Sequence, residues 1–140
     1  MDAEMEYTVK IRVRYGETDQ MGIVYHPNYY VWFELARTEL LREIGISYHQ
    51  IEERGFLIPV IETHCRHLQA AHYDEVITVG VEPGESKGIR FSFRYVARRG
   101  EETLATGETW HTFINGEGRP VRLQRKAPDI YNKLSEAGIL

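Results

Sequence analysis

One segment of this chain, from about Asn28 to Ile44, repeats its apolar residues with the three- and four-residue spacing of an α-helix. The main apolar face comprises Tyr29, Trp32, Phe33, Ala36, Leu40 and Ile44. Further apolar residues border this face, so the apolar part is wider than on a helix that lies on a protein surface. The sequence therefore predicts a long helix that is covered on more than one side.

Most of the remaining sequence alternates apolar and polar residues, which is typical of half-buried β-strands. The predicted strands cover residues 7–15, 56–68, 75–82, 89–96 and 103–115, and shorter helices are predicted at 47–54 and 128–137. Consecutive strands with short turns form antiparallel sheets. The order of elements predicts an α+β fold, in which one long helix packs across an antiparallel sheet of about five strands.

Length, charge and cysteine content narrow the class of protein. The chain has 140 residues, which suits a single domain over residues 1–140. Its formal net charge is −4, whereas a nucleic-acid-binding protein usually carries a positive surplus. The single cysteine, Cys65, cannot form an internal disulfide, which fits a reducing compartment. Residues 1–7 are acidic and lack the apolar run of a signal peptide, so we expect a cytoplasmic protein without membrane insertion.

The segment between the first strand and the long helix has no clear period and is predicted to be a loop. It holds a carboxylate, Asp19, and a glycine, Gly22, within ten residues of the helix start. The first turn of a helix presents unpaired N–H groups and the positive end of the helix dipole, which can stabilise an oxyanion. A nearby carboxylate can act on a carbonyl as a base or as a nucleophile. This loop is therefore a candidate catalytic site.

The same loop resembles the signature of the 4-hydroxybenzoyl-CoA thioesterase-like hotdog family, which includes the Tol-Pal-associated acyl-CoA thioesterases. The matching residues are Tyr15, Thr18-Asp19, Gly22, Ile23-Val24, Tyr25-His26 and Asn28-Tyr29. The following Phe33-Glu34-Leu35-Ala36-Arg37 is similar to the central helix of the family. The resemblance implies a hotdog fold, in which a curved antiparallel sheet wraps around a long central helix. It also implies a homodimer, and further a homotetramer.

The resemblance implies that the protein hydrolyses an acyl-CoA to a free acid and coenzyme A. Asp19 matches the catalytic carboxylate, as nucleophile or as general base, and the backbone N–H of His26 matches the oxyanion donor. Gly22 is expected to let the backbone approach the thioester closely. No cofactor is implied, because coenzyme A is part of the substrate.

Substrate contacts are implied at four further positions. Tyr25 and Asn28 belong to the same motif as Asp19. Lys87 lies between two predicted strands, where the family often places phosphate contacts. Arg90, the fourth position, is a weaker candidate of the same kind, as are Arg125 and Lys126.

Several alternatives remain open at this point. The substrate could be an acyl group on a carrier protein, or the chain could be a non-catalytic acyl-CoA-binding module. A hydratase of the same fold is disfavoured, because the Asp/His dyad motif of those enzymes is absent. Glu34 is a competing carboxylate on the predicted helix, since related hotdog enzymes place theirs there. The acyl group itself is not specified by the sequence.

A cluster of potential metal ligands, His64, Cys65, His67 and His72, has no standard zinc spacing. Strand alternation places His64 and His67 on opposite faces, so we expect no metal site there. His111 is expected to be a core residue.

Overall fold

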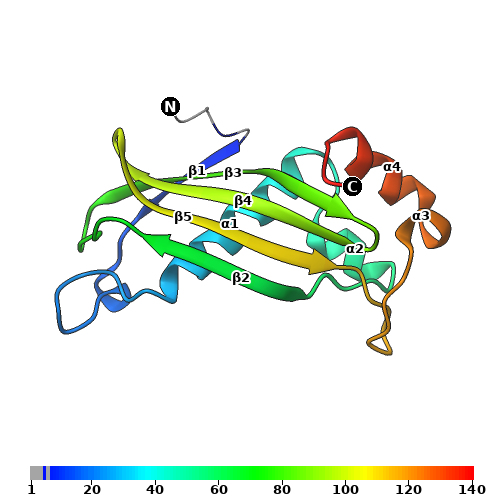
Figure 1. Ribbon diagram of the computed structural model, residues 1–140, viewed down its shortest axis with the longest axis horizontal. Helices are drawn as coiled ribbons and strands as arrows, with labels where there is room; N and C mark the ends of the chain where they lie inside the picture. Colours follow the sequence, from blue (N-terminus) through cyan, green and yellow to red (C-terminus); the bar gives the residue numbers. More distant parts are fainter. Residues whose placement is uncertain (1–4, 6) are drawn as a thin grey trace.

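The computed structural model describes residue 5 and residues 7–140, and its described elements form a sheet with helices (Figure 1). In chain order they are β1 (Tyr7–Arg12), the 3₁₀ helix η1 (Tyr15–Glu17), α1 (Asn28–Glu43), α2 (Tyr48–Glu53), β2 (Val60–His67), β3 (Val76–Lys87), β4 (Arg90–Arg99), β5 (Glu102–Thr112), α3 (Leu123–Lys126) and α4 (Pro128–Glu136). This confirms the predicted α+β class.

The five strands form one antiparallel sheet in the order β1-β3-β4-β5-β2. Strand β2 does not pair with β3, which follows it in sequence, but lies on the far side of β5, where Thr63 faces Thr109. Among the described strands β2 has a neighbour on one side only, so it forms an edge of the sheet.

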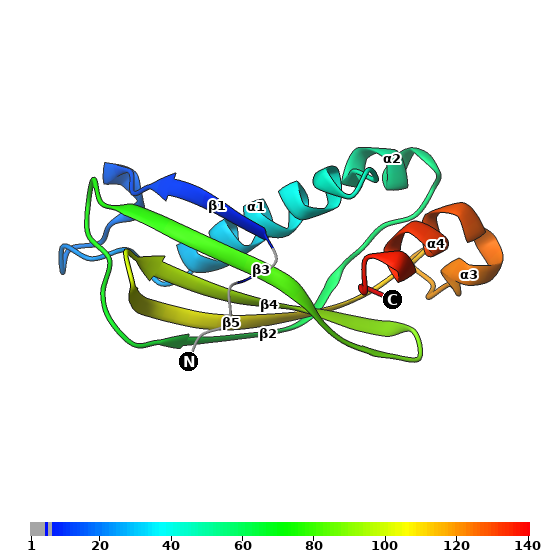
Figure 2. The same ribbon diagram turned by 90° about the horizontal axis from the view of Figure 1, so that it is seen from above.

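Helix α1 lies along one face of the sheet, and the sheet curves around it (Figure 2). Phe33, at the centre of the helix, stacks on Tyr95 of β4 with ring centroids 4.3 Å apart. A Cβ atom at Gly107 of β5 would overlap the Phe33 ring, so glycine permits this close approach. No helix within the described residues is long and apolar enough to cross a membrane.

The boundaries of the long helix agree with its apolar period, since α1 ends at Glu43, one residue before the predicted end. The predicted burial on several sides is wrong for the single chain, because Val31 and Leu35 are exposed. The strand predicted from residue 56 begins only at Val60, because Leu57 forms an isolated bridge with Ile114. The late start of β2 thus depends on a residue that lies far away in the sequence.

A line of polar groups crosses the interior beneath α1. Arg37 is only 6% exposed and donates to the hydroxyls of Tyr48, at 3.2 Å, and Tyr95, at 3.4 Å. The Tyr95 hydroxyl contacts Thr109 at 2.6 Å, and Thr109 contacts Nε2 of His111 at 2.7 Å. His111 is therefore a core residue, as predicted, whereas the burial of Arg37 was not foreseen.

Candidate active site

The loop that carries the sequence motif is anchored by a buried carboxylate, Glu17. Its side chain is 6% exposed and accepts hydrogen bonds from the N–H of Arg14, at 2.8 Å, and from Nε1 of Trp32, at 3.0 Å. Trp32 belongs to α1, so this carboxylate fixes the start of the loop on the long helix. Hydrogen bonds to an ionised acceptor are stronger than those between neutral groups.

The backbone carbonyl of Glu17 fixes the other end of the same loop. It accepts the N–H of Tyr25 at 2.8 Å and Nδ2 of Asn28 at 2.9 Å. Between these anchors, Thr18 and Val24 form a β-bridge, and the N–H of Asp19 donates to Ile23 at 2.9 Å. Residues 18–24 are thus held as a closed loop against the start of α1. We call them the Asp19 loop.

Asp19 itself is half-buried. Its Oδ1 accepts the N–H of Met21 at 2.9 Å, and within the described part of the chain its other carboxylate oxygen has no protein partner. Gly22 has a φ of +79°, a conformation that other residues adopt only with strain. The glycine is therefore needed for the turn that presents Asp19, and, its chain neighbours aside, no atom of residues 5 and 7–140 lies within 4 Å of where its Cβ would be.

The N-terminal end of α1 follows immediately. Pro27 is the capping residue and offers no side-chain cap. The N–H of His26 donates to no acceptor among residues 5 and 7–140, whereas the N–H of Asn28 is bonded to the carbonyl of Tyr25. Unpaired N–H groups at a helix start favour negative charge. Within the described residues, one segment thus carries both a carboxylate oxygen without a protein partner, on Asp19, and an unpaired N–H at the start of the helix, on His26.

Aromatic side chains surround this end of the helix. The exposed ring of Tyr25 meets His26 edge-on at 5.2 Å, and His26 meets His67 at 6.2 Å. His67, on β2, also packs edge-on against the buried Tyr29 at 4.8 Å. Burial, and then the neighbouring His26, lower the pKa of His67 below its ordinary value. No sequence pattern predicts this contact, because His67 is 41 residues from His26.

Lys87 and Arg90, the two cations expected to contact the phosphates of coenzyme A, differ in their surroundings. Lys87 lies at the turn between β3 and β4 and is 3.8 Å from Glu85. Arg90 is paired with Glu62 and lies over the ring of Trp110, 5.2 Å from its centroid. The charge of Arg90 is thus already opposed by a carboxylate.

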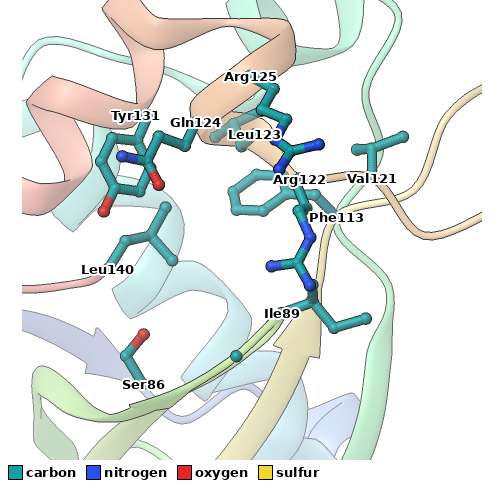
Figure 3. A pocket seen from close by; sticks show the side chains of 11 residues that line it. Ser86, Ile89, Phe113, Val121, Arg122, Leu123, Gln124, Arg125, Tyr131 and Leu140 are labelled. Atoms are coloured by element: carbon teal, nitrogen blue, oxygen red, sulfur yellow. The ribbon is translucent and has the colours of Figure 1, made fainter.

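A pocket of about 200 Å³ lies next to this turn, between the strand ends and the C-terminal helices (Figure 3). Ser86 and Gly88, which flank Lys87, line it together with Phe113. Two further lining residues, Arg122 and Arg125, form no ion pair within the described residues. Arg125 was a weak candidate from the sequence, whereas Arg122 was missed because a lone arginine carries no motif.

Comparison with known proteins assigns the family. Residues 13–137 match the family model of the thioesterase-like superfamily. YneP of Bacillus subtilis is 32% identical over 130 residues, which cover 91% of this chain and 94% of that protein. An acyl-CoA thioesterase of Haemophilus influenzae, YbgC, is 28% identical over 91% of this chain and 96% of its own. The crystal structure of DHNA-CoA thioesterase from Staphylococcus aureus superimposes with a TM-score of 0.89 at 30% identity, covering 94% of this chain and 90% of that chain.

The chain belongs to the thioesterase-like superfamily.

The family resemblance inferred from the loop motif is thereby confirmed, and so is the hotdog fold. The protein is a thioesterase.

Within one chain, the thioesterase does not bring all the predicted site residues together. Asp19, Gly22, Tyr25, His26 and Asn28 lie in or beside the Asp19 loop. In Figure 1 this loop lies at the left end of the sheet, whereas the β3–β4 turn with Lys87 lies at the right end. A single chain thus separates the candidate catalytic groups from the candidate phosphate-binding cations.

Proposed function

We propose that the protein hydrolyses the thioester of an acyl-CoA to a free acid and coenzyme A, with Asp19 as its catalytic carboxylate. The observation that carries this proposal is the pairing of two unengaged groups. Within the part of the chain that the structure describes, one Asp19 oxygen lacks a protein partner, and so does the N–H of His26 at the start of α1. The double anchor at Glu17 ties the segment that carries both groups to the start of α1.

The chemistry requires a group that attacks the carbonyl carbon and a donor that stabilises the oxyanion formed. Asp19 either attacks the carbon directly, giving a mixed anhydride that water cleaves, or removes a proton from an attacking water. The His26 N–H donates to the oxyanion in both cases. The thiolate of coenzyme A leaves readily, so no strong general acid is needed.

A second copy of the chain would complete the substrate site. Strand β2 has an unpaired outer edge, and apolar side chains on and beside it are exposed: Leu57, Val60, Ile61 and Leu68. Antiparallel pairing of two β2 edges reverses one protomer relative to the other. The Asp19 loop of one protomer would then lie near the β3–β4 turn of its partner. We propose a homodimer of this kind, while the homotetramer stays a prediction.

In such a dimer, the phosphates of coenzyme A would find the partner's cations. Arg122 and Arg125 line the pocket beside Phe113, which offers an apolar wall, and Lys87 lies between two further lining residues, Ser86 and Gly88. We therefore favour coenzyme A over a carrier protein as the thiol component. The relatives named above support this choice, since their names refer to CoA thioesters. The cytoplasmic location stays a prediction.

The decisive experiment measures thiol release from a panel of acyl-CoA substrates with aliphatic and aromatic acyl groups. Asp19→Asn keeps the size of the side chain but removes its charge, so we expect kcat to fall by about 10²-fold or more. Asp129→Asn, an exposed carboxylate on α4, serves as the matched control and should retain full activity. Retained activity in Asp19→Asn together with loss in Glu34→Gln would transfer the catalytic role to Glu34.

A further inference from the structure

The Asp19 loop rests on a second segment, residues 68–75, which connects β2 to β3. The carbonyl of Ala71, a fully buried residue, accepts the N–H of Val24 at 2.9 Å. Val24 is itself buried and forms the β-bridge that closes the Asp19 loop. The position of the Ala71 peptide therefore helps to determine the position of the loop.

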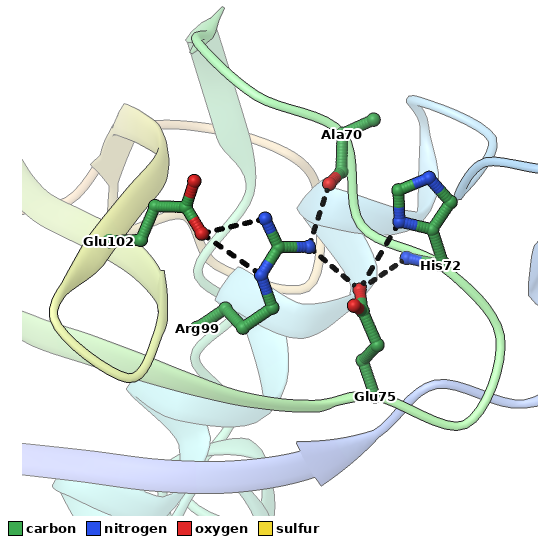
Figure 4. A network of polar contacts seen from close by, with 5 residues as sticks. All are labelled: Ala70, His72, Glu75, Arg99 and Glu102. Atoms are coloured by element: carbon green, nitrogen blue, oxygen red, sulfur yellow. Dashed lines mark hydrogen bonds and ion pairs between the residues drawn. The ribbon is translucent and has the colours of Figure 1, made fainter.

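One side chain, Arg99 at the end of β4, organises the 68–75 segment (Figure 4). Its Nη1 donates to the carbonyl of Ala70 at 3.1 Å and to Glu75 at 2.9 Å. Its Nε and Nη2 donate to Glu102 at 3.1 Å and 2.7 Å. We call these four residues the Arg99 clamp.

Glu75 ties the clamp back into the segment, because Oε1 also accepts the N–H of His72 at 2.7 Å. Ala70 and His72, on either side of Ala71, are thus both held. The backbone carbonyl of Glu75 accepts the N–H of Val13 at 2.9 Å, which joins the segment to the chain just before the motif. The clamp therefore holds, on both sides, the Ala71 peptide whose carbonyl accepts the N–H of Val24.

We propose that Arg99 is a positioning residue for the thioesterase site, which acts through Ala70 and Ala71 on Val24 and so on the Asp19 loop. The inference rests on the proposed role of Asp19. Arg99 donates to three separate acceptors at once, and only a planar guanidinium presents donors in that fixed arrangement. Lysine would keep the charge but would lose this geometry.

If the role of Arg99 were purely structural, its ion pairs would act mainly on the global stability of the fold. Ion pairs between partly exposed side chains, however, contribute little to global stability. The side chains of Arg99 and Glu75 are 28% and 30% exposed, so their main effect is expected in the local geometry. A small displacement of a catalytic group lowers the rate far more than it lowers the stability of the fold.

The matched control lies on the same strand. Arg94 of β4 donates to Glu82 at 2.8 Å and 3.2 Å, and these bonds reach neither residues 68–75 nor the Asp19 loop. The experiment compares Arg99→Gln, Arg99→Lys and Arg94→Gln, with two readouts. One is kcat and KM for thiol release. The other is backbone hydrogen exchange over residues 15–29, which does not depend on activity.

We expect Arg99→Gln to lower kcat by about tenfold or more with little change in KM, and to accelerate exchange over residues 15–29. Arg99→Lys should recover part of both effects, and Arg94→Gln should show neither. If Arg99→Gln fails to fold, Glu102→Gln weakens the same clamp more mildly and takes its place.

Unchanged kcat and exchange in folded Arg99→Gln, or equal losses in Arg94→Gln, would overturn the inference. Failure of the proposed function looks different. In that case Asp19→Asn keeps its activity, while the exchange experiment still tests whether Arg99 holds the loop.

Discussion

His111 is a buried histidine that the fold keeps neutral. It is 0% exposed, and the rings of Phe91 and Phe93 lie 5.5 Å away. Among the described residues its Nδ1 has no hydrogen-bond partner of ordinary geometry. Burial, and then the charge of Arg37, lower the pKa of His111 to about 3.

The lowered pKa of His111 predicts that the folded protein loses stability on mild acidification. The unfolded chain takes up a proton at His111 near its ordinary pKa of 6.5, whereas the folded chain does so only near 3. The contribution of neutral His111 to the stability of the fold is therefore fully present above pH 6.5, and it is lost progressively as the pH falls from 6.5 towards 3. The slope approaches about 1.4 kcal/mol per pH unit. Urea denaturation at pH 7, 6 and 5 should show a flatter dependence in His111→Gln than in the native chain, and equal slopes would contradict the prediction.

At the scale of elements, the junction between η1 and α1 depends on one carboxylate. The Glu17 carboxylate accepts one hydrogen bond from its own turn and one from Trp32 of the helix. It therefore joins two elements that are otherwise linked through the whole loop between them. Removing the charge from a buried acceptor leaves its donors poorly paired.

Glu17→Gln should therefore destabilise the fold by about 2 kcal/mol or more, because both charge-assisted hydrogen bonds weaken together. Denaturation followed by tryptophan fluorescence measures the change, and thiol release should decline in parallel as the Asp19 loop loosens. Glu53→Gln, at an exposed position on α2, is the matched control and should leave stability unchanged. A neutral Glu17→Gln would show that the loop is held by its backbone bonds alone.

Sequence patterns were informative where the interactions are local. The period of residues 28–44 located α1, and Ser47 does cap α2, where it accepts the N–H of Gln50. The motif also located a loop whose anchors, Glu17 and Asn28, are close in sequence. The burial of Arg37 and the clamp at Arg99 could not be foreseen, because Tyr95 lies 58 residues from Arg37, and Glu75 and Ala70 lie 24 and 29 residues from Arg99. The catalytic role of Asp19 stays a prediction.

At the scale of the whole molecule, the open edge of β2 is the surface most in need of a partner. An unpaired edge with exposed apolar residues is a site for pairing with another chain. The exposed Val31 and Leu35 on α1 add further uncovered apolar surface. These features agree with the proposed homodimer.

A charged residue on this edge should separate the protomers. We expect Ile61→Lys to sediment as a folded monomer and to lose most thiol-release activity, since the proposed site draws on both chains. Val76→Lys, at a similarly exposed position on β3, should leave the assembly and activity unchanged. An Ile61→Lys variant that is monomeric yet fully active would show that one chain suffices for catalysis.

The place of β2 beside β5 has a consequence during translation. β2 ends at His67, yet β5, its partner among the described strands, begins at Glu102, so the ribosome must release more than thirty further residues before the edge can form. Until then the apolar side of α1 lacks the strands β3 to β5 that will cover it. Folding must therefore wait until the C-terminal half of the chain has been synthesised. Chaperones would be needed most while only the N-terminal half has left the ribosome.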